Sequence, residues 1–481
     1  MIYVIGSGLS GIAAAVALVK RGYHPTILDA GLKPDPDAAM LKARLAATEP
    51  EHWNSEDVSL LRQIGPAAAC GIPRKLHFGS EFTHRDADRA TSPHLRGASM
   101  FRSFAGGGFS NVWGATFEPI AESEFRDWPI TAADLSRHYA AVRALLFQLP
   151  AASVGEPPVA GLNPSSQTQA LYHDLNSSKM ELEHRGIRFN YPNLAVLTTD
   201  QDKERGCRYC GFCLYGCPYD SIYTAGATLS RLVREGRIDY ISGVIVDKVS
   251  LQDAGVRIDA RSLTGGISKT FRGSRVFVAA GLLDSTRIIL NSTGSPGTPI
   301  RIRHSDMFTL PIVRYRSSRS MAREKHHTMC QLVLKIDDST ISQHSVHLQL
   351  YGYNDLYIKL LGSKLGALAA PLAPALRALT NRLFIAFGYV HSDVSSSIRA
   401  TLPKENDRKL LLDGQPGGEV RRIGRAVTRK LFQARGCFRA VPVPTELRLD
   451  IPGGGYHSSG FNTQELCDLD VWQFLIPDEN E

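Results

Sequence analysis

The chain opens with Ile2-Tyr-Val-Ile5, passes through Gly6-Ser-Gly-Leu-Ser-Gly11 and an alanine-rich stretch, and reaches Thr26-Ile-Leu-Asp29. An apolar strand, a Gly-x-Gly-x-x-Gly turn, a helix and a second strand follow one another here at the spacing of a βαβ unit. A lone glycine motif is weak support, but the strand, helix and closing acid all fall in their required places. This stretch therefore predicts a dinucleotide-binding fold that begins at the first residues of the chain.

Each polar or small residue of this unit has an expected role. Gly6 permits the tight turn out of the strand, and Gly8 lets backbone amides approach a pyrophosphate at the helix N-terminus. Gly11 lets the helix pack closely on the strand, and Asp29 is placed to bind a ribose hydroxyl.

Length and charge limit the classes of protein that need to be considered. A chain of 481 residues is too long for one ordinary core, so we expect about two domains. The formal charge of +8 comes from scattered basic residues without a nucleic-acid module, so no nucleic-acid partner is expected. Because the first strand begins at residue 2, no secretory signal is expected, and we expect a cytoplasmic location.

Four of the eight cysteines form one compact run, Cys207-x2-Cys210-x2-Cys213-x3-Cys217-Pro. This is the spacing of bacterial ferredoxins, so the run predicts ligands to an iron–sulfur cluster. The fourth cysteine of those ferredoxins serves a second cluster, and a single run is therefore compatible with 4Fe-4S or 3Fe-4S. The alternatives are a zinc site, which usually joins separated cysteine pairs, a disulfide, which a reducing compartment disfavours, and a vestigial site.

A second glycine-rich stretch follows at residues 100–117. Its centre reads Gly106-Gly107-Gly108-Phe109-Ser110-Asn111-Val112-Trp113-Gly114. The glycines expose backbone amides, so this loop can lie flat against a ring system. A flexible surface loop is the alternative, and the embedded Phe and Trp argue against it.

These motifs, in their order along the chain, resemble the glucose-methanol-choline (GMC) family of flavoprotein oxidoreductases. Three further blocks carry the resemblance: the Trp128-Pro-Ile130 helix start, the Val276–Leu290 block with Ala280 and Gly281, and the Gly453–Gly460 block with His457. Trp113 stands where the family often has Asn, as in its bacterial branch. Residues 300–440 match the family weakly.

The resemblance implies FAD rather than NAD. It places the ADP part on Gly6, Gly8, Gly11 and Asp29, and the isoalloxazine against backbone between Gly107 and Gly114. It also implies that a strand over 240–246, which includes Val244, contacts the adenine, although an ordinary buried strand would explain that pattern equally well. The cofactor-binding residues expected on these grounds are Gly6, Gly8, Gly11, Asp29, Gly107, Gly108, Ser110, Asn111, Trp113, Gly114, Val244, Ala280 and Gly281.

The expected fold class is α/β, with a discontinuous Rossmann-like FAD-binding domain and an α+β substrate domain built on an antiparallel sheet. The FAD domain is expected over 1–299, with a cysteine-rich insertion at about 200–225, and the substrate domain over 300–440. Residues 441–481 are expected to return to the FAD domain in a form shorter than in the family. Two explanations are open for this short C-terminal segment: a truncated or frameshifted reading frame, or a divergent way of closing the FAD-binding domain.

The implied function is oxidation of a CH–OH group in an alcohol or in a sugar or glycan substrate. A hydride passes to the flavin, His457 is the catalytic base, and electrons leave through the cluster to a protein or quinone acceptor. Two rivals remain: a catalytically impaired or truncated flavoprotein or partner subunit, and a redox-neutral lyase or isomerase.

Two segments of the expected substrate domain have patterns of their own. The apolar stretch 356–390 is too interrupted by charges and prolines to span a membrane, so a buried helix pair is expected. An interfacial helix with peripheral membrane contact and a substrate-channel wall stay open for it. Apolar residues at helical spacing predict a helix over 420–431 whose basic residues form a solvated face rather than an anion-binding patch.

Overall fold

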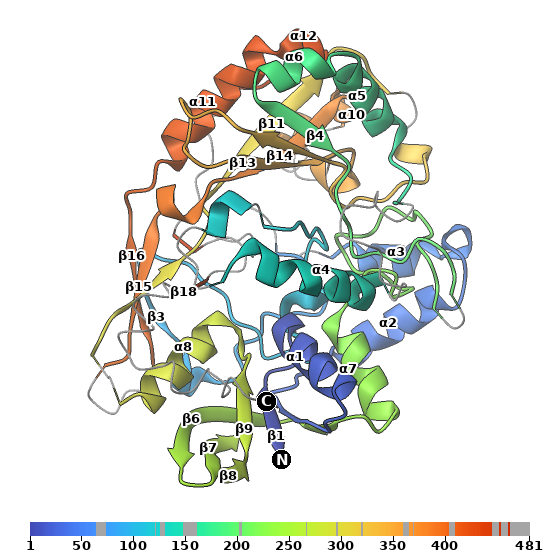
Figure 1. Ribbon diagram of the computed structural model, residues 1–481. Coiled ribbons are helices and arrows are strands. Elements are labelled where there is room, and N and C mark those ends of the chain that lie inside the picture. The colour runs from blue at the N-terminus through green and yellow to red at the C-terminus, as the bar shows by residue number, and fades with distance from the viewer. Residues whose placement is uncertain are drawn as a thin grey trace.

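The computed structural model of the protein describes residues 1–63, 74–120, 122–125, 130–147, 161–201, 204–265, 267–294, 297–318, 321–358, 365–368, 370–403, 409–444, 452–453 and 460–461. Its parallel sheet and a three-stranded sheet lie at the bottom of Figure 1, and a six-stranded antiparallel sheet lies at the top. A five-stranded sheet at the left of the view lies between them.

The parallel sheet is built on the N-terminal unit. Strand β1 (Ile2–Ile5) is buried along its whole length and pairs in parallel with β2 (Thr26–Leu28) and β9 (Arg275–Val278). With β5 (Asp239–Ile241) beyond β2, the strand order is β5-β2-β1-β9. Continuous apolar strands are typical of a sheet that is covered on both faces.

Different elements cover the two faces of this sheet. Helices α1 (Leu9–Lys20) and α7 (Ala225–Arg234) pack on one face around Ile12 and Leu229. Helix α8 (Gly281–Ser292) and the antiparallel sheet of β6 (Val244–Gln252), β7 (Gly255–Ser262) and β8 (Ser268–Gly273) cover the other. The Rossmann-like half of the expected fold class is thereby confirmed.

The single strand expected over 240–246 is wrong. Strand β5 ends at Ile241, and Gly243 takes a left-handed conformation with φ +72° before β6 begins in a different sheet. A side chain at this position would be strained, so the glycine permits the change of sheet.

The antiparallel half of the expected fold class is confirmed as well. The six strands run in the order β17 (Ala440–Pro442), β11 (Met307–Arg314), β14 (Leu383–Tyr389), β13 (Val346–Tyr351), β12 (Leu332–Ile336) and β4 (Ile187–Asn190). Helices α5 (Ser166–Ser177), α6 (Lys179–His184), α11 (Val420–Gln433) and α12 (Arg435–Phe438) share the hydrophobic core on one face of this sheet.

The helix expected over 420–431 is confirmed as α11, with Val420, Ile423, Val427 and Leu431 buried and Arg421 exposed on the opposite face. The buried helix pair expected over 356–390 is only partly correct. Residues 356–358 and α10 (Ala373–Thr380) are helical, but most of α10 is exposed, and 383–389 form a strand. Helix α10 leads directly into β14, which lies between β11 and β13 in the sheet. Cross-strand pairing decides the structure of this apolar run.

The five-stranded sheet joins distant parts of the chain. Its order is β18 (Gly460–Phe461), β10 (Ile300–Arg303), β15 (Ser397–Thr401), β16 (Leu411–Gln415) and β3 (His94–Arg96). The remaining helices are α2 (Pro36–Ala46), α3 (Ser55–Leu61) and α4 (Ala132–Phe147). Within the described residues, no helix combines the length and the apolar character that crossing a bilayer requires.

Candidate functional site

The glycine turn between β1 and α1 has the geometry that its sequence predicts. Gly6 has φ +97°, and a Cβ at Gly6 would overlap the carbonyl oxygen of Ala279. A Cβ at Gly11 would overlap the carbonyl oxygen of Gly6. A Cβ at Gly8, the N-cap of α1, would meet nothing within 4 Å. Two glycines are thus required by the protein's own packing, and the third faces open space at a helix N-terminus, where an anionic group binds favourably.

Asp29 lies at the carboxyl end of β2, only 9% exposed. Its carboxylate accepts hydrogen bonds from the hydroxyls of Ser7 and Tyr240, the latter at 3.0 Å. Burial raises the pKa of Asp29 to about 6, although both hydrogen bonds act in the opposite direction. The backbone of Ala30 and Ser7 also hydrogen-bonds to this carboxylate, so the acid is fixed in position at the end of the strand.

The second glycine stretch packs directly on the first. A Cβ at Gly108 would lie 3.3 Å from the Cα of Gly8, and the Gly107 N–H donates to Ser7 Oγ at 2.9 Å. Gly107 has φ +83°, and a Cβ there would lie 2.6 Å from the backbone nitrogen of Gly226 at the start of α7. Two motifs about 100 residues apart therefore form one site.

The polar side chains of this loop hold its shape. Ser110 Oγ accepts the Ala225 N–H at 2.9 Å, and Asn111 donates to the Gly106 and Gly108 carbonyls at 3.0 and 2.7 Å. Trp113 Nε1 donates to the Tyr223 carbonyl at 2.8 Å. These bonds fix the conformation of the glycine backbone.

Three of the remaining expected cofactor residues also lie close to this turn or to the loop. Gly281 has φ +75° and faces open space, and a Cβ at Gly6 would lie 3.0 Å from the Cα of Ala280. Gly114 is exposed, and a Cβ there would lie 3.5 Å from the Tyr351 hydroxyl on β13.

Val244 lies deeper than these residues. Its N–H donates to the Asp29 carbonyl at 3.0 Å, but its side chain is buried in the core between the sheets. The expected adenine contact of Val244 stays a prediction.

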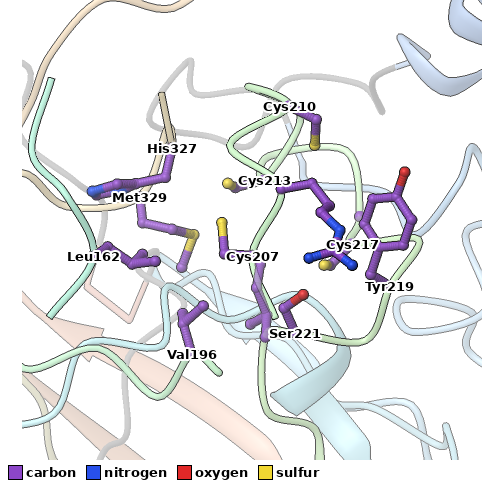
Figure 2. Close-up of a pocket in the computed structure, with 13 residues that line it drawn as sticks. Leu162, Val196, Cys207, Cys210, Cys213, Cys217, Tyr219, Ser221, His327 and Met329 are labelled. Atoms are coloured by element: carbon purple, nitrogen blue, oxygen red, sulfur yellow. The ribbon is translucent and has the colours of Figure 1, made fainter. Parts of the chain in front are cut away.

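The four cysteines of the compact run line a single cavity. Figure 2 shows the side chains of Cys207, Cys210, Cys213 and Cys217 around one space, with Met329 on another wall. All four are free thiols, so the disulfide alternative finds no support in this geometry.

A single zinc ion and an iron–sulfur cluster require different spacings of the sulfur atoms. Among the described residues, no three of the cysteine sulfurs lie within 4.8 Å of one another, since the one group that close is His344, His391 and Asp393. A tetrahedral zinc ion with Zn–S bonds of about 2.3 Å would hold its sulfurs ~3.8 Å apart. A cluster of several irons spreads its thiolates further than one zinc ion does, and four cysteine thiolates are its usual ligands.

Backbone amides point at these sulfurs. The Tyr209 N–H donates to Cys207 Sγ and the Thr328 N–H donates to Cys213 Sγ, each at 3.4 Å. Burial, together with the neighbouring Cys213, raises the pKa of Cys207 to about 12. Binding of a metal group would therefore release thiol protons, and the amides would then hydrogen-bond the thiolates.

A second cavity connects the cysteines with the glycine loop. Cys217, Gly216 and Ile222 line both cavities, and Ser110, Asn111 and Trp113 form another part of the second wall. Lys75, His77, Asp220 and Thr224 also line this cavity. The structure therefore brings the two expected cofactor sites side by side.

Some site residues were missed by sequence reasoning, and one expected residue cannot be placed. Ser7 lies inside the glycine motif and Tyr240 lies inside the apolar run 240–246, so the sequence carries a signal for both residues. Lys75 and His77 belong to a segment with no diagnostic pattern. His457 lies outside the described residues, three positions before β18.

Comparison with known proteins agrees with the first of these sites. Residues 4–34 match the NAD(P)-binding Rossmann-like domain. A search of curated proteins found no match to the chain. The match covers the glycine turn and Asp29 but not the other blocks of the GMC resemblance. The chain thus has an N-terminal Rossmann-like dinucleotide-binding domain of the kind found in FAD- and NAD-dependent oxidoreductases.

Proposed function

We propose that this protein is an FAD-dependent dehydrogenase that oxidises a CH–OH group of an alcohol or sugar-type substrate and passes the electrons on through an iron–sulfur cluster. The observation that carries the proposal is the shared wall at Cys217, which joins the cysteine-lined cavity to the glycine loop beside the dinucleotide turn. A redox-neutral lyase or isomerase would not need an electron-transfer centre beside its flavin, because its reaction releases no electrons.

The residues of the N-terminal site fit FAD. The open face of Gly8 and the N-terminus of α1 would hold the pyrophosphate, and the Asp29 carboxylate would accept a ribose hydroxyl. The backbone between Gly107 and Gly114 would lie against the isoalloxazine. When bound, FAD supplies a two-electron acceptor for the hydride of the alcohol carbon. The protein positions the substrate, and His457 would take the hydroxyl proton.

The cysteine cavity fits an iron–sulfur cluster. Cys207, Cys210, Cys213 and Cys217 would supply the thiolates, and the apolar wall that includes Val196 and Met329 would limit the access of water. When bound, the cluster supplies one-electron transfer, which suits a protein or quinone acceptor outside the chain. If the acceptor is a quinone, peripheral contact of the protein with a membrane would bring the two together.

The domain division expected from the sequence is part of this proposal. Residues 1–299 would form the FAD-binding domain with its cysteine-rich insertion, and 300–440 would form the substrate domain. Residues 441–481 would return to the FAD-binding domain. Strands β3 and β4 belong to the first range but complete sheets whose other strands lie after residue 299.

The deciding experiment is anaerobic purification followed by a visible spectrum, flavin quantitation, and iron and acid-labile sulfide analysis. The proposal expects stoichiometric FAD, iron with sulfide, and bleaching of the flavin by an alcohol or sugar. A chain that binds FAD but is reduced by none of these substrates would instead be an impaired flavoprotein or partner subunit. Stoichiometric zinc without sulfide would remove the electron-transfer part of the proposal.

A further inference from the structure

Lys75 lies between the two candidate cofactor sites. Its amine donates a hydrogen bond to the Trp113 carbonyl at 3.2 Å and lines the cavity that Cys217 shares with the glycine loop. The long side chain thus brings a cation to the inner side of the cysteine run.

The charge of Lys75 has no carboxylate partner among the described residues, since none lies within 4.0 Å of its amine. Asp220 lines the same cavity, but both its oxygens accept from Lys42, at 2.5 and 2.7 Å. Lys75 therefore differs from Lys42, whose charge is already matched.

Arg208 is a second cation at the cysteine cavity, but its charge is also matched. Its guanidinium donates to both oxygens of Asp200 at 2.9 Å and lies 3.3 Å from Glu49. His77, beside Lys75, is buried and bonded to the Asn111 backbone, while its Nδ1 has no partner. Burial lowers the pKa of His77 to about 3, so its imidazole adds no charge to this wall.

An unmatched cation that is partly removed from water is unfavourable unless an anion joins it. The hydrogen bond to the Trp113 carbonyl and the cavity at Cys217 place the Lys75 ammonium beside the cysteine run. Four thiolates around an iron–sulfur group would supply the missing negative charge. The direction of the electrostatic effect is then fixed, because a nearby cation stabilises the reduced, more negative form of the group.

We propose that Lys75 is the counter-charge of the iron–sulfur group held by the four cysteines and raises its reduction potential, so that electrons leave the flavin site toward it. This inference rests on the proposed function, since it needs the cysteine run to hold such a group. It assigns Lys75 a role in setting the potential, and not a role as a ligand or as a base.

The test is a redox titration of the anaerobically purified protein, followed by electron paramagnetic resonance, on wild type and Lys75→Met. Methionine keeps the length of the side chain and removes its charge. We expect unchanged iron, sulfide and FAD contents, and a reduction equilibrium at least tenfold less favourable, which is ~59 mV for a one-electron couple. Lys75→Arg should keep the wild-type potential. The matched control is Lys430→Met on α11, which removes a cation that bonds to Asp338 and should leave the potential unchanged.

The outcomes separate this inference from the proposed function. Absence of iron and sulfide in the wild type would contradict the function itself. An intact cluster whose potential is equal in wild type and Lys75→Met would overturn the role of Lys75 and leave the function standing. If Lys75→Met loses the cluster, retention in Lys75→Arg supports the counter-charge, and loss in Lys75→Arg as well overturns it.

Discussion

Tyr240 and Asp29 meet across the carboxyl ends of two neighbouring parallel strands, where the Tyr240 hydroxyl donates to the Asp29 carboxylate at 3.0 Å. The residue expected to bind a ribose is therefore held in place by a strand more than 200 residues further along the chain. Its raised pKa makes its hydrogen-bonding state depend on pH in the range where most binding assays are done.

The first prediction concerns dinucleotide affinity. With a pKa of about 6, Asp29 becomes protonated below that pH and loses part of its capacity to accept a ribose hydroxyl. FAD affinity should therefore fall as pH drops below about 6, and Asp29→Asn should bind FAD roughly tenfold more weakly, because a charge-assisted hydrogen bond is lost. Flavin-fluorescence titrations from pH 5 to 8 measure both effects. A wild-type affinity that does not vary over this range would contradict the role of Asp29.

The same shift predicts how the flavin-free protein responds to pH. Asp29 has a folded pKa of about 6 against an ordinary value of 3.8, so between these values the folded chain binds more protons than the unfolded chain. Its contribution to stability is therefore complete below about pH 4 and is lost as pH rises to about 6, a change of about 3 kcal/mol. Denaturation of flavin-free wild type and Asp29→Asn at several pH values should show this slope in the wild type alone.

The glycines of the first turn should separate folding from binding. Gly11→Val places a side chain on the carbonyl oxygen of Gly6, so it should destabilise the domain by about 1–3 kcal/mol and release FAD. Gly8→Val enters open space, so it should keep the stability of the flavin-free protein and lose FAD. Thermal unfolding and flavin content distinguish the two variants. Full flavin content in folded Gly11→Val would show that the turn is wrongly assigned.

Cys210→Ser should remove one ligand of the cysteine centre. We expect loss of iron, sulfide and the broad visible absorbance, with FAD still bound through the separate N-terminal turn. Cys437→Ser is the control, because Cys437 is a free thiol in the core of the antiparallel domain. Equal metal content in the two variants would exclude the run as the metal site.

His457→Ala should leave FAD binding unchanged and slow flavin reduction about 100-fold, the usual effect of a positioned general base. Stopped-flow measurement of flavin reduction by an alcohol substrate checks this prediction. If the rate in the variant equals that of the wild type, the base lies elsewhere.

The parts of the fold that could be predicted are those whose pattern is local. The turn from Gly6 to Gly11 and the helix from Val420 carry their spacing in a few consecutive residues, and both have the expected structure. The change of sheet at Gly243 and the strand Leu383–Tyr389 were missed, because each depends on partners distant in sequence. Strand β14 pairs with β11 and β13, and apolar periodicity alone cannot report that pairing.

The candidate site divides in the same way. The spacing of Cys207 and the other three cysteines of the run predicts a metal cluster. Lys75 and His77 have no such spacing relationship with Cys217. Only the packing of residues 74–80 against the cysteine loop brings them to one cavity. The sequence around Lys75 has no pattern from which the absence of a carboxylate partner could be predicted.

The bond from Thr328 to Cys213 has a consequence for how the protein is made. The two residues are 115 positions apart, and His326 also pairs with Cys210 as an isolated bridge. A nascent chain that has reached residue 300 contains all four cysteines but lacks the segment that closes over two of them. Metal delivered during synthesis would meet an open loop, whereas metal delivered after release would meet an enclosed one. If the cysteines hold a cluster as proposed, its insertion would have a limited period of access, which ends when the segment before β12 docks.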